Sequence, residues 1–577
     1  MSRELPPVAP SVTAALVAAL TPRLRKRLDA GIAKLADRPA ERDGAVVRIA
    51  LDDATGLELH APDGTVRSTD AVRCGCLLAP ECLHRAAIAS AAPVADDTDS
   101  AEPGGSSQET PATQPPSARP ETATAEQCAA ARALHSAAAA VLEAGTDGAG
   151  AVLQAGLLRA AHAARLAGLH RGAASAVSVV TALRAARDAD PAYRLDDLVA
   201  RLRDVLTVAH RVPAADGTEL TGLRGTARQP YRPDGSLRLY GLFSEPVVTA
   251  SGYAGAVTWT ADAAGRLFQV SDVAPGGAGR AVGAADRAVR IGDTALSHRE
   301  LSRAGLAVSG ATVSPGGRLG AGARVRAVAA AGAGWREEPL DRLWQAPMAE
   351  QVERALSGGH DLLFLEVTLA GTAAEATGEC LLAESDGVAL RLTRAHDDPA
   401  LPCRDNLRLL AAARGSRLRV VARLTPAPHP RAQLLAAEHP AVAGERVDLG
   451  FDRLQRADLP AVPASPVPAS PVPAASSAPA EAPVHLLRRR VQQAVSGGRR
   501  VLSFPGDTAA DVRRLGRSGL VTAGDLLEAL HGAAAERSRD VFGRLLPTDP
   551  DRFARAWLAA ARYTDELDRA LCAAAWT

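Results

Sequence analysis

Lysine is nearly absent from this chain: only Lys26 and Lys34 occur among 577 residues, and arginine supplies every other fixed cation. A phosphate-binding P-loop needs a lysine beside Ser or Thr, a protein kinase needs a strand lysine, and a Schiff-base enzyme needs a lysine amine. The sequence of residues 35–577 therefore excludes these three enzyme classes. Together with the abundant alanine, the preference for arginine indicates a GC-rich bacterial genome.

The chain also has almost no net charge, because 66 Lys and Arg residues nearly balance 65 Asp and Glu residues and leave a formal charge of +1. No global field steers the chain toward nucleic acid or an anionic membrane. Such binding would need a local patch, and the sequence offers two, the run Arg23–Arg27 and the run Arg488–Arg490 with Arg499 and Arg500. Runs of this kind are more often solvated helix faces than phosphate-binding sites.

The first 29 residues contain one short apolar patch, with neither a basic leader before it nor the length of a membrane span. Four of the seven cysteines are scattered singly, which is not a disulfide framework. These four are Cys128, Cys380, Cys403 and Cys572. We therefore expect a cytoplasmic protein that does not enter a membrane.

Known catalytic motifs are missing as well, because neither HExxH nor a GxSxG elbow occurs and no nucleophile–base pair can be assigned. We expect a protein that is not an enzyme, with no catalytic residue, no site for an organic cofactor and no small-molecule substrate. A third hypothesis is that residues 222–440 form an enzyme of unrecognised type. It would need a cleft with perturbed acid or histidine groups.

Aromatic residues make up only 3% of the chain, yet six of them gather within one strand-rich stretch. They could stack nucleic-acid bases on a β surface, or they could form the hydrophobic core of that region. The core is the favoured interpretation, because aromatic residues are scarce elsewhere. The six are Tyr231, Tyr240, Phe243, Tyr253, Trp259 and Phe268.

Helical and strand periodicities alternate along the chain, which predicts a multidomain α+β protein. Two stretches rich in Ser, Thr, Pro and Ala have little to bury and are predicted to be disordered linkers. The predicted order is a basic N-terminal helix with a small ββα-like zinc module (1–95), a linker (96–125), a helical array (126–210), a β-rich region of two units (222–440), a Pro/Ala-rich linker (460–483) and a helical C-terminal region (484–577).

The remaining three cysteines fall within nine residues, in the segment Arg73-Cys-Gly-Cys-Leu-Leu-Ala-Pro-Glu-Cys-Leu-His-Arg85. Three thiolates and one imidazole form a tetrahedral ligand set that structural zinc accepts. In an extended segment Cys74 and Cys76 point to the same side, so both can face one ion. We expect Cys82 to precede a helix and His84 to lie in its first turn. The sequence thus predicts one structural Zn²⁺ on Cys74, Cys76, Cys82 and His84, and a chance group of reactive or buried cysteines is the alternative.

This pattern, CxC followed a few residues later by CxH between β-strands and an apolar helix, resembles the SWIM zinc finger over residues 40–95. In that family Cys74, Cys76, Cys82 and His84 would be the four ligands. SWIM modules act as DNA-binding or protein-interaction units. Because the P-loop lysine is missing, the chain resembles the stand-alone bacterial kind, which is associated with AAA ATPases and von Willebrand A proteins.

The resemblance implies a zinc-binding interaction module that contacts either DNA or a protein partner. Arg73, Arg85 and the Arg23–Arg27 run would offer charge to DNA. The alternative is a scaffold or regulatory subunit of a protein complex, with an AAA ATPase as one candidate partner, in which zinc is purely structural. Salt-dependent retention on DNA distinguishes the two, because phosphate contacts weaken steeply as salt rises.

Overall fold

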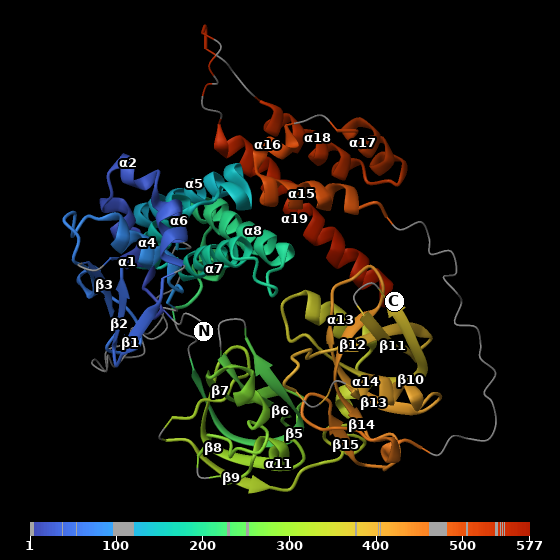
Figure 1. Ribbon diagram of the computed structural model, residues 1–577. Coiled ribbons are helices and arrows are strands. Elements are labelled where there is room, and N and C mark those ends of the chain that lie inside the picture. Colours follow the sequence, from blue (N-terminus) through green and yellow to red (C-terminus); the bar gives the residue numbers. More distant parts are fainter. Residues whose placement is uncertain are drawn as a thin grey trace. The chain divides into compact units, whose positions relative to one another are not determined.

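The computed structural model places most of the chain in two compact units (Figure 1). The first contains Met1–Arg228 and Glu481–Thr564, and the second contains Gln229–Ala480 and Asp565–Thr577. The mixed helix and sheet content confirms the α+β multidomain class. Most of each predicted linker lies outside the residues that the structure describes. The described residues are 5–36, 38–52, 55–95, 121–227, 231–249, 253–292, 294–322, 324–375, 378–401, 403, 405–460, 482–503, 506–536, 540–542, 544, 546 and 549–577.

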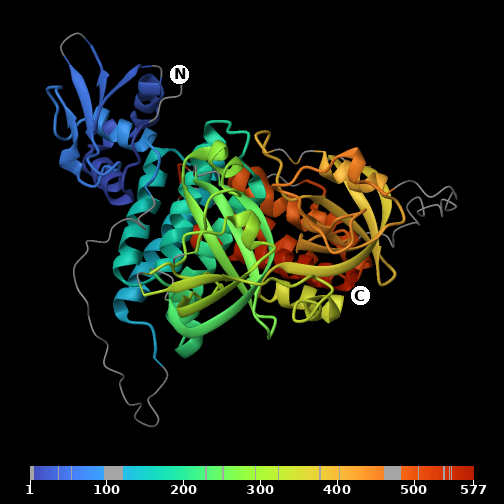
Figure 2. The same ribbon diagram turned by 90° about the horizontal axis from the view of Figure 1, so that it is seen from below.

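The first unit begins with a small module of helices around a four-stranded antiparallel sheet, blue in Figures 1 and 2. Alternating apolar residues of β2 and β3, such as Ile49 and Leu57, point to one face of the sheet and pack with Ile88 of α4. The elements are α1 (Pro10–Ala19), α2 (Pro22–Arg25), α3 (Leu28–Ala36), β1 (Ala40–Asp43), β2 (Val46–Ala50), β3 (Gly56–His60), β4 (Val72–Cys74) and α4 (Leu83–Ala91), with strand order β1-β2-β3-β4.

The rest of the first unit is helical and joins two segments that are far apart in the sequence. The first segment contains α5 (Ala125–Gly148), α6 (Ala151–Leu166), α7 (His170–Arg187), α8 (Leu195–Arg211) and α9 (Gly217–Arg224). The second contains α15 (His485–Gly497), α16 (Arg499–Leu502), α17 (Thr508–Arg517), α18 (Val521–Ala535) and α19 (Pro550–Ala575), whose last residues belong to the second unit.

These two helical segments share one hydrophobic core, in which Leu134 and Leu142 of α5 pack with Val491 and Trp557. At their closest approach a Cβ added to Gly145 would lie 2.2 Å from the Gly498 nitrogen, so the contact requires glycine. The sequence indicated a C-terminal region set apart by a proline-rich stretch. Its periodicity carried no sign that this region packs against the helical array.

The predicted basic patch of the C-terminal region is partly wrong, because Arg499 is buried. Its guanidinium donates to the carbonyls of Ala533 and Ala534 and lies 3.3 Å from the Glu143 carboxylate. A buried arginine of this kind holds segments together and is neither a solvated face nor a phosphate site. Arg490 is likewise engaged, at 3.3 Å from Asp511.

The second unit contains two β-barrels. The barrel nearer the C-terminus is built from β10 (Leu362–Glu375), β11 (Gly378–Ser385), β12 (Val388–Arg394), β13 (Arg417–Leu424) and β14 (Arg431–Glu438), with β15 (Arg446–Asp448) added at the edge. Four pairs are antiparallel, and the parallel pair β12–β14, in register at Arg391 and Arg431, closes the barrel. Helix α14 (Asn406–Ala412) joins the third strand to the fourth. This is the topology of an OB-fold.

The other sheet repeats this arrangement with β5 (Arg232–Val248), β6 (Tyr253–Ala261), β7 (Leu267–Pro275), β8 (Gly305–Val313) and β9 (Arg326–Ala330). Its first strand again pairs with the second and the fourth. Helices α10 (Gly277–Val282) and α11 (His298–Leu301) again join the third strand to the fourth. A parallel bridge between Gln269 of β7 and Arg318 brings the third strand to the segment before β9. The second unit is therefore a tandem of two OB-like barrels.

The two barrels meet through a buried ionic and aromatic interface. Glu245 of β5 accepts hydrogen bonds from Arg423 of β13 at 2.7 Å and from Trp259 Nε1 at 2.8 Å. His396 Nε2 lies 3.5 Å from the same carboxylate. Burial alone would raise the pKa of Glu245, but the hydrogen bonds and the charge of Arg423 lower it to about 2. The link between the barrels thus depends on an ionised Glu245.

The core interpretation of the clustered aromatic residues is confirmed for Phe243, Trp259 and Phe268, which are buried. Phe243 and Trp259 stack with ring centroids 6.2 Å apart in the interface core. Tyr231 differs, since 42% of it is exposed. The remaining connections are α12 (Arg342–Gln345) and α13 (Met348–Leu356), which lie between the two barrels in the sequence.

Within the described ranges, no helix combines the length and the apolar character that crossing a bilayer requires. The cytoplasmic location stays a prediction.

We expect Glu245→Gln to lower the free energy of unfolding of the second unit by about 3 kcal/mol, because Arg423 would lose its buried partner. The pKa of Glu245 is about 2 when folded against an ordinary 4.5, so its contribution is complete above pH 4.5 and is lost as pH falls toward 2. Urea unfolding followed by tryptophan fluorescence at pH 7 and pH 3 measures both effects.

Glu379→Gln is the matched control, because its 3.4 Å pair with Arg408 is exposed and of little energetic value. Equal destabilisation by the two substitutions would contradict the role given to Glu245.

Candidate metal centre

The sheet and the helix of the N-terminal module bring four ligand atoms together. Strand β4 ends at Cys74, which pairs with Leu57 of β3, and Cys82 is the residue before α4. His84 lies in the first turn of that helix, as predicted. The three Sγ atoms and one imidazole nitrogen all lie within 4.8 Å of one another, and Cys74 Sγ is 3.8 Å from His84 Nδ1.

The structure therefore confirms that Cys74, Cys76, Cys82 and His84 form a cluster able to hold a metal ion. Among the described residues no other group of three or more His, Cys, Asp or Glu side chains has this geometry. The site has two halves, one at the end of a sheet (57–76) and one at the start of a helix (82–91). A metal ion would join them directly.

The electrostatics of the cluster favour a cation. Burial, together with the neighbouring Cys76 and Cys82, raises the pKa of Cys74 to about 12. Burial also raises the pKa of Cys82. Burial opposes ionisation of Cys76 too, but backbone N–H groups of Leu78 and Ala79 and the two other thiols lower its pKa. Three thiolates this close would repel one another, so a positive ion is what would let all three ionise.

Arg85 holds the same three segments with its guanidinium. It is 7% exposed and donates to the carbonyls of Val72 in β4, Pro80 in the Cys76–Cys82 loop and Thr69 before β4. These bonds satisfy backbone carbonyls that would otherwise lack partners. The expectation that Arg85 offers charge to DNA is therefore wrong, because its donors face inward.

The loop between the second and third cysteine has an unusual surface. Leu77 is fully exposed and Leu78 is 64% exposed, although large apolar side chains normally seek burial. The backbone turns back here through a 3.0 Å hydrogen bond from Ala79 N to Cys76 O. Their position between the ligands Cys76 and Cys82 is the only signal in the sequence that marks these two leucines.

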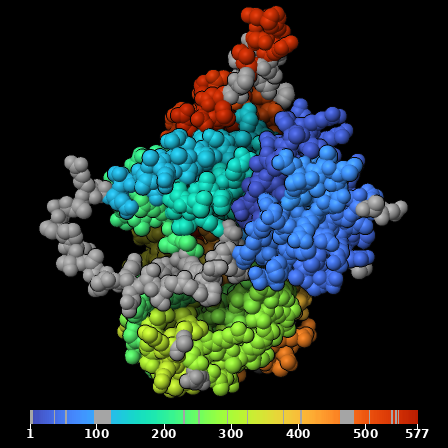
Figure 3. Space-filling view, turned by 90° about the vertical axis from the view of Figure 1, so that its left-hand side faces the viewer, coloured from blue at the N-terminus to red at the C-terminus, as the bar shows by residue number. Residues whose placement is uncertain are grey.

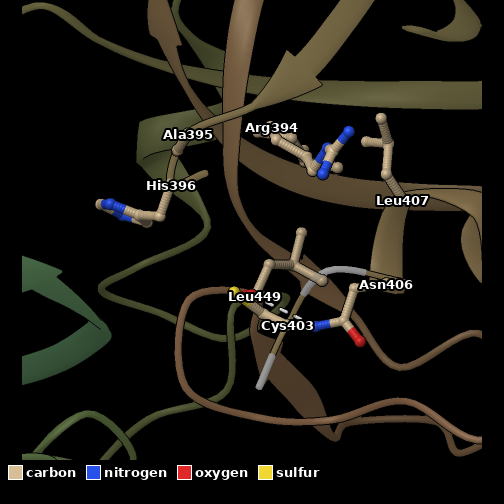
Figure 4. Close-up of a pocket in the computed structure, with 8 residues that line it drawn as sticks. Arg394, Ala395, His396, Cys403, Asn406, Leu407 and Leu449 are labelled. Carbon is tan, nitrogen blue, oxygen red and sulfur yellow. Dashed lines mark hydrogen bonds between the residues drawn. The ribbon is translucent and has the colours of Figure 1, made fainter. Parts of the chain in front are cut away.

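The second unit contains a small cavity near the barrel interface (Figure 4). It is lined by His396, Cys403 and Asn406, and its volume is about 20 Å³, enough for about one water molecule. Asn406 Nδ2 already donates a hydrogen bond to the carbonyl of Leu449 at 3.2 Å. This cavity is too small for an organic substrate.

A larger cavity of about 630 Å³ lies in the first unit between α3, α4, α6 and α7. Its arginines already have partners. Arg184 donates to the carbonyl of Ala92 and to Gln154, and Arg187 lies 3.3 Å from Asp29. Asp29 in turn accepts from the Ala151 nitrogen at the start of α6. The polar groups here connect the metal-site module to the helical array.

No protein-family model matches this chain, and no curated protein matches it. The resemblance to SWIM fingers therefore depends on the ligand pattern and its structural setting.

We expect Arg85→Ala to destabilise the metal-site module by about 2–3 kcal/mol, because three carbonyls would lose a charged donor. Amide hydrogen exchange in β4 and α4 is the measurement, and it should speed up in these two elements. Arg73→Ala is the control, since Arg73 is exposed and makes only a 3.4 Å contact with the Asp70 carbonyl. Unchanged exchange in the Arg85 variant would refute the structural role.

Proposed function

We propose that the cluster binds one Zn²⁺ and that the zinc is structural. Thiolates and imidazole are the donors that zinc prefers, and Cys3His is one of its closed structural ligand sets. With all four positions filled by protein atoms, no position is left for a water or a substrate. The ion would supply the positive charge that the three thiols need and would fasten β4 to α4.

We further propose that this zinc module is a protein-interaction unit of SWIM type, and that its contact surface is the Leu77–Leu78 loop. The observation that carries this proposal is the full exposure of Leu77 between two metal ligands. An exposed apolar pair on a fixed loop gains free energy by burial against a partner. Holding the loop at Cys76 and Cys82 keeps the entropic cost of that binding low.

DNA is the less favoured partner for the same module, because Arg85 is engaged internally. The exposed cations that stay available are Arg23, Lys26, Arg27 and Arg73. These side chains could contact DNA phosphates only as part of an exposed, solvated basic surface. Salt-dependent retention that disappears when Arg23, Lys26 and Arg27 are replaced by alanine would favour DNA over protein.

The alternative is a scaffold or regulatory subunit whose zinc only stabilises the fold, with an AAA ATPase as one candidate partner. The tandem barrels and the shared helical core favour it, since both provide large folded surfaces. In that version the Leu77–Leu78 loop makes no contact. That the chain is not an enzyme stays a prediction.

We expect the purified protein to contain one zinc per chain and Cys76→Ser to lose it. Chelation should raise hydrogen exchange in β3, β4 and α4, because a unit this small depends on its metal. Cys128→Ser is the control, since Cys128 belongs to α5 and has no part in the cluster. Full protection of these elements after complete metal removal would show that zinc is not structural.

We expect Leu77→Ser with Leu78→Ser to abolish partner recovery in a pull-down, while zinc content and thermal unfolding stay unchanged. Leu166→Ser in α6 is the matched control, because that leucine is also 76% exposed in the same unit. Partners lost with the double variant and kept with the control support the proposal. Identical partner sets for all three proteins would favour the scaffold alternative.

A further inference from the structure

The loop between β8 and β9 in the first barrel concentrates positive charge. Residues 314–325 read Ser-Pro-Gly-Gly-Arg-Leu-Gly-Ala-Gly-Ala-Arg-Val, and Arg326 follows at the start of β9. No Asp, Glu, Asn or Gln occurs between Glu300 and Glu337. The arginines therefore have no acidic neighbour in the sequence to neutralise them.

The fold gathers these arginines around the outer end of β8. Leu319 N donates to Gln269 O of β7 at 2.9 Å, and Gly320 N donates to Thr312 O of β8 at 2.8 Å. Arg232, at the start of β5, is in register with Val313, and Arg326 is in register with Ser309. The surface of this barrel is green to yellow in Figure 3.

A partly exposed aromatic ring lies beside the arginines. A Cβ added to Gly320 would lie 3.1 Å from the ring of Tyr231, so the loop and the ring are adjacent. Tyr231 is 42% exposed. We call Tyr231, Arg232, Arg318, Arg324 and Arg326 the arginine end of the first barrel.

The four arginines of this end are exposed and have no carboxylate within ion-pair distance among the described residues. Their neighbour Arg266 shows the contrast, because it pairs with Asp262 at 2.7 Å and with Asp234 at 3.3 Å. Exposed cations without carboxylate partners create a positive local potential, and an external polyanion would be attracted to it.

The second barrel has the same topology but lacks this charge in the corresponding loop. Three of its exposed arginines are paired: Arg391 with Glu375 at 3.1 Å, Arg408 with Glu379 at 3.4 Å and Arg417 with Glu366 at 2.8 Å. Arg414, between α14 and β13, is exposed without such a pair among the described residues. Its loop between β13 and β14 reads Thr-Pro-Ala-Pro-His-Pro and contains no arginine. The unneutralised charge in the loop after the fourth strand therefore occurs in the first barrel and not in the second.

We propose that the arginine end of the first barrel binds single-stranded DNA. OB barrels bind oligonucleotides through the loops after their first and fourth strands, and the β8–β9 loop is the one after the fourth strand. Arg232, Arg318, Arg324 and Arg326 contact phosphates, and Tyr231 stacks on one base. A glycine-rich loop with no carboxylate or amide side chain provides little to read base edges, so the binding is insensitive to sequence.

This inference is independent of the zinc proposal, because the arginine end and the metal cluster belong to different units. The zinc-deficient Cys76→Ser protein keeps its single-strand affinity. A DNA signal that disappears in Cys76→Ser but survives in the arginine variant would place the binding at the zinc module and overturn the inference.

The test is fluorescence polarisation of the full chain with a labelled oligo(dT) over a series of salt concentrations. In R318A/R324A/R326A the affinity at low salt falls at least tenfold, and the slope of log K against log salt falls by about 2, since each phosphate contact contributes about 0.7. The control R391A/R408A/R417A removes the same formal charge from the second barrel and changes the affinity less than twofold.

Two further variants separate charge from stacking. Arginine-to-lysine replacement at positions 318, 324 and 326 keeps the salt slope. Tyr231→Phe keeps the affinity, whereas Tyr231→Ala weakens it about fivefold or more. Thermal unfolding confirms that each variant is folded. Absence of oligo(dT) binding at low salt, tighter binding of duplex DNA or of RNA of the same length, or an equal loss in the second-barrel control would each overturn the proposal.

Discussion

Hydrogen bonds from arginine side chains to buried acceptors are the interaction on which the connections of this fold depend. Arg85 joins the sheet, the loop and the helix of the metal-site module, Arg499 joins the C-terminal helices to α5, and Arg423 joins the two barrels. The planar guanidinium offers five donors in a fixed fork, so it can satisfy several carbonyls or a carboxylate at once. A lysine ammonium could not cover acceptors that diverge in this way. The near absence of lysine thus agrees with how the chain holds its segments together.

The sequence was informative where the relevant contacts are local. Cys74 to His84 span a few residues, and strand alternation before them and an apolar helix after them place all four ligands. By contrast, the backbone contacts that close the barrels join residues distant in sequence. In one barrel strand β12 pairs with β14 at Arg391 and Arg431, and in the other a β-bridge joins Gln269 to Arg318. Periodicity identifies strands but does not specify which strands pair.

The dependence on contacts distant in sequence also explains why the burial of Arg85 and Arg499 was not predicted. Whether an arginine is a surface charge or an internal link depends on its partner, and Arg423 and Glu245 are 178 residues apart. Arg85 and Arg499 both occur in sequence settings that indicate exposed basic faces, yet tertiary contacts bury them. The arginines of the β8–β9 loop and of the start of β9 are the opposite case, because none of them has a carboxylate within ion-pair distance among the described residues. Only the comparison of two barrels with one topology makes that difference visible.

Both proposed contact surfaces are loops that the fold holds at their two ends. The Leu77–Leu78 loop would be held at Cys76 and Cys82 by the proposed zinc, and Arg85 donates to its Pro80 carbonyl. The β8–β9 loop is fixed by backbone hydrogen bonds from Leu319 and Gly320 to two different strands. Ordering a free loop of this length on binding would cost about 1–2 kcal/mol for each residue fixed. Because the folded chain has already ordered both loops, the apolar contacts of one and the charges of the other can contribute to binding with little of that cost.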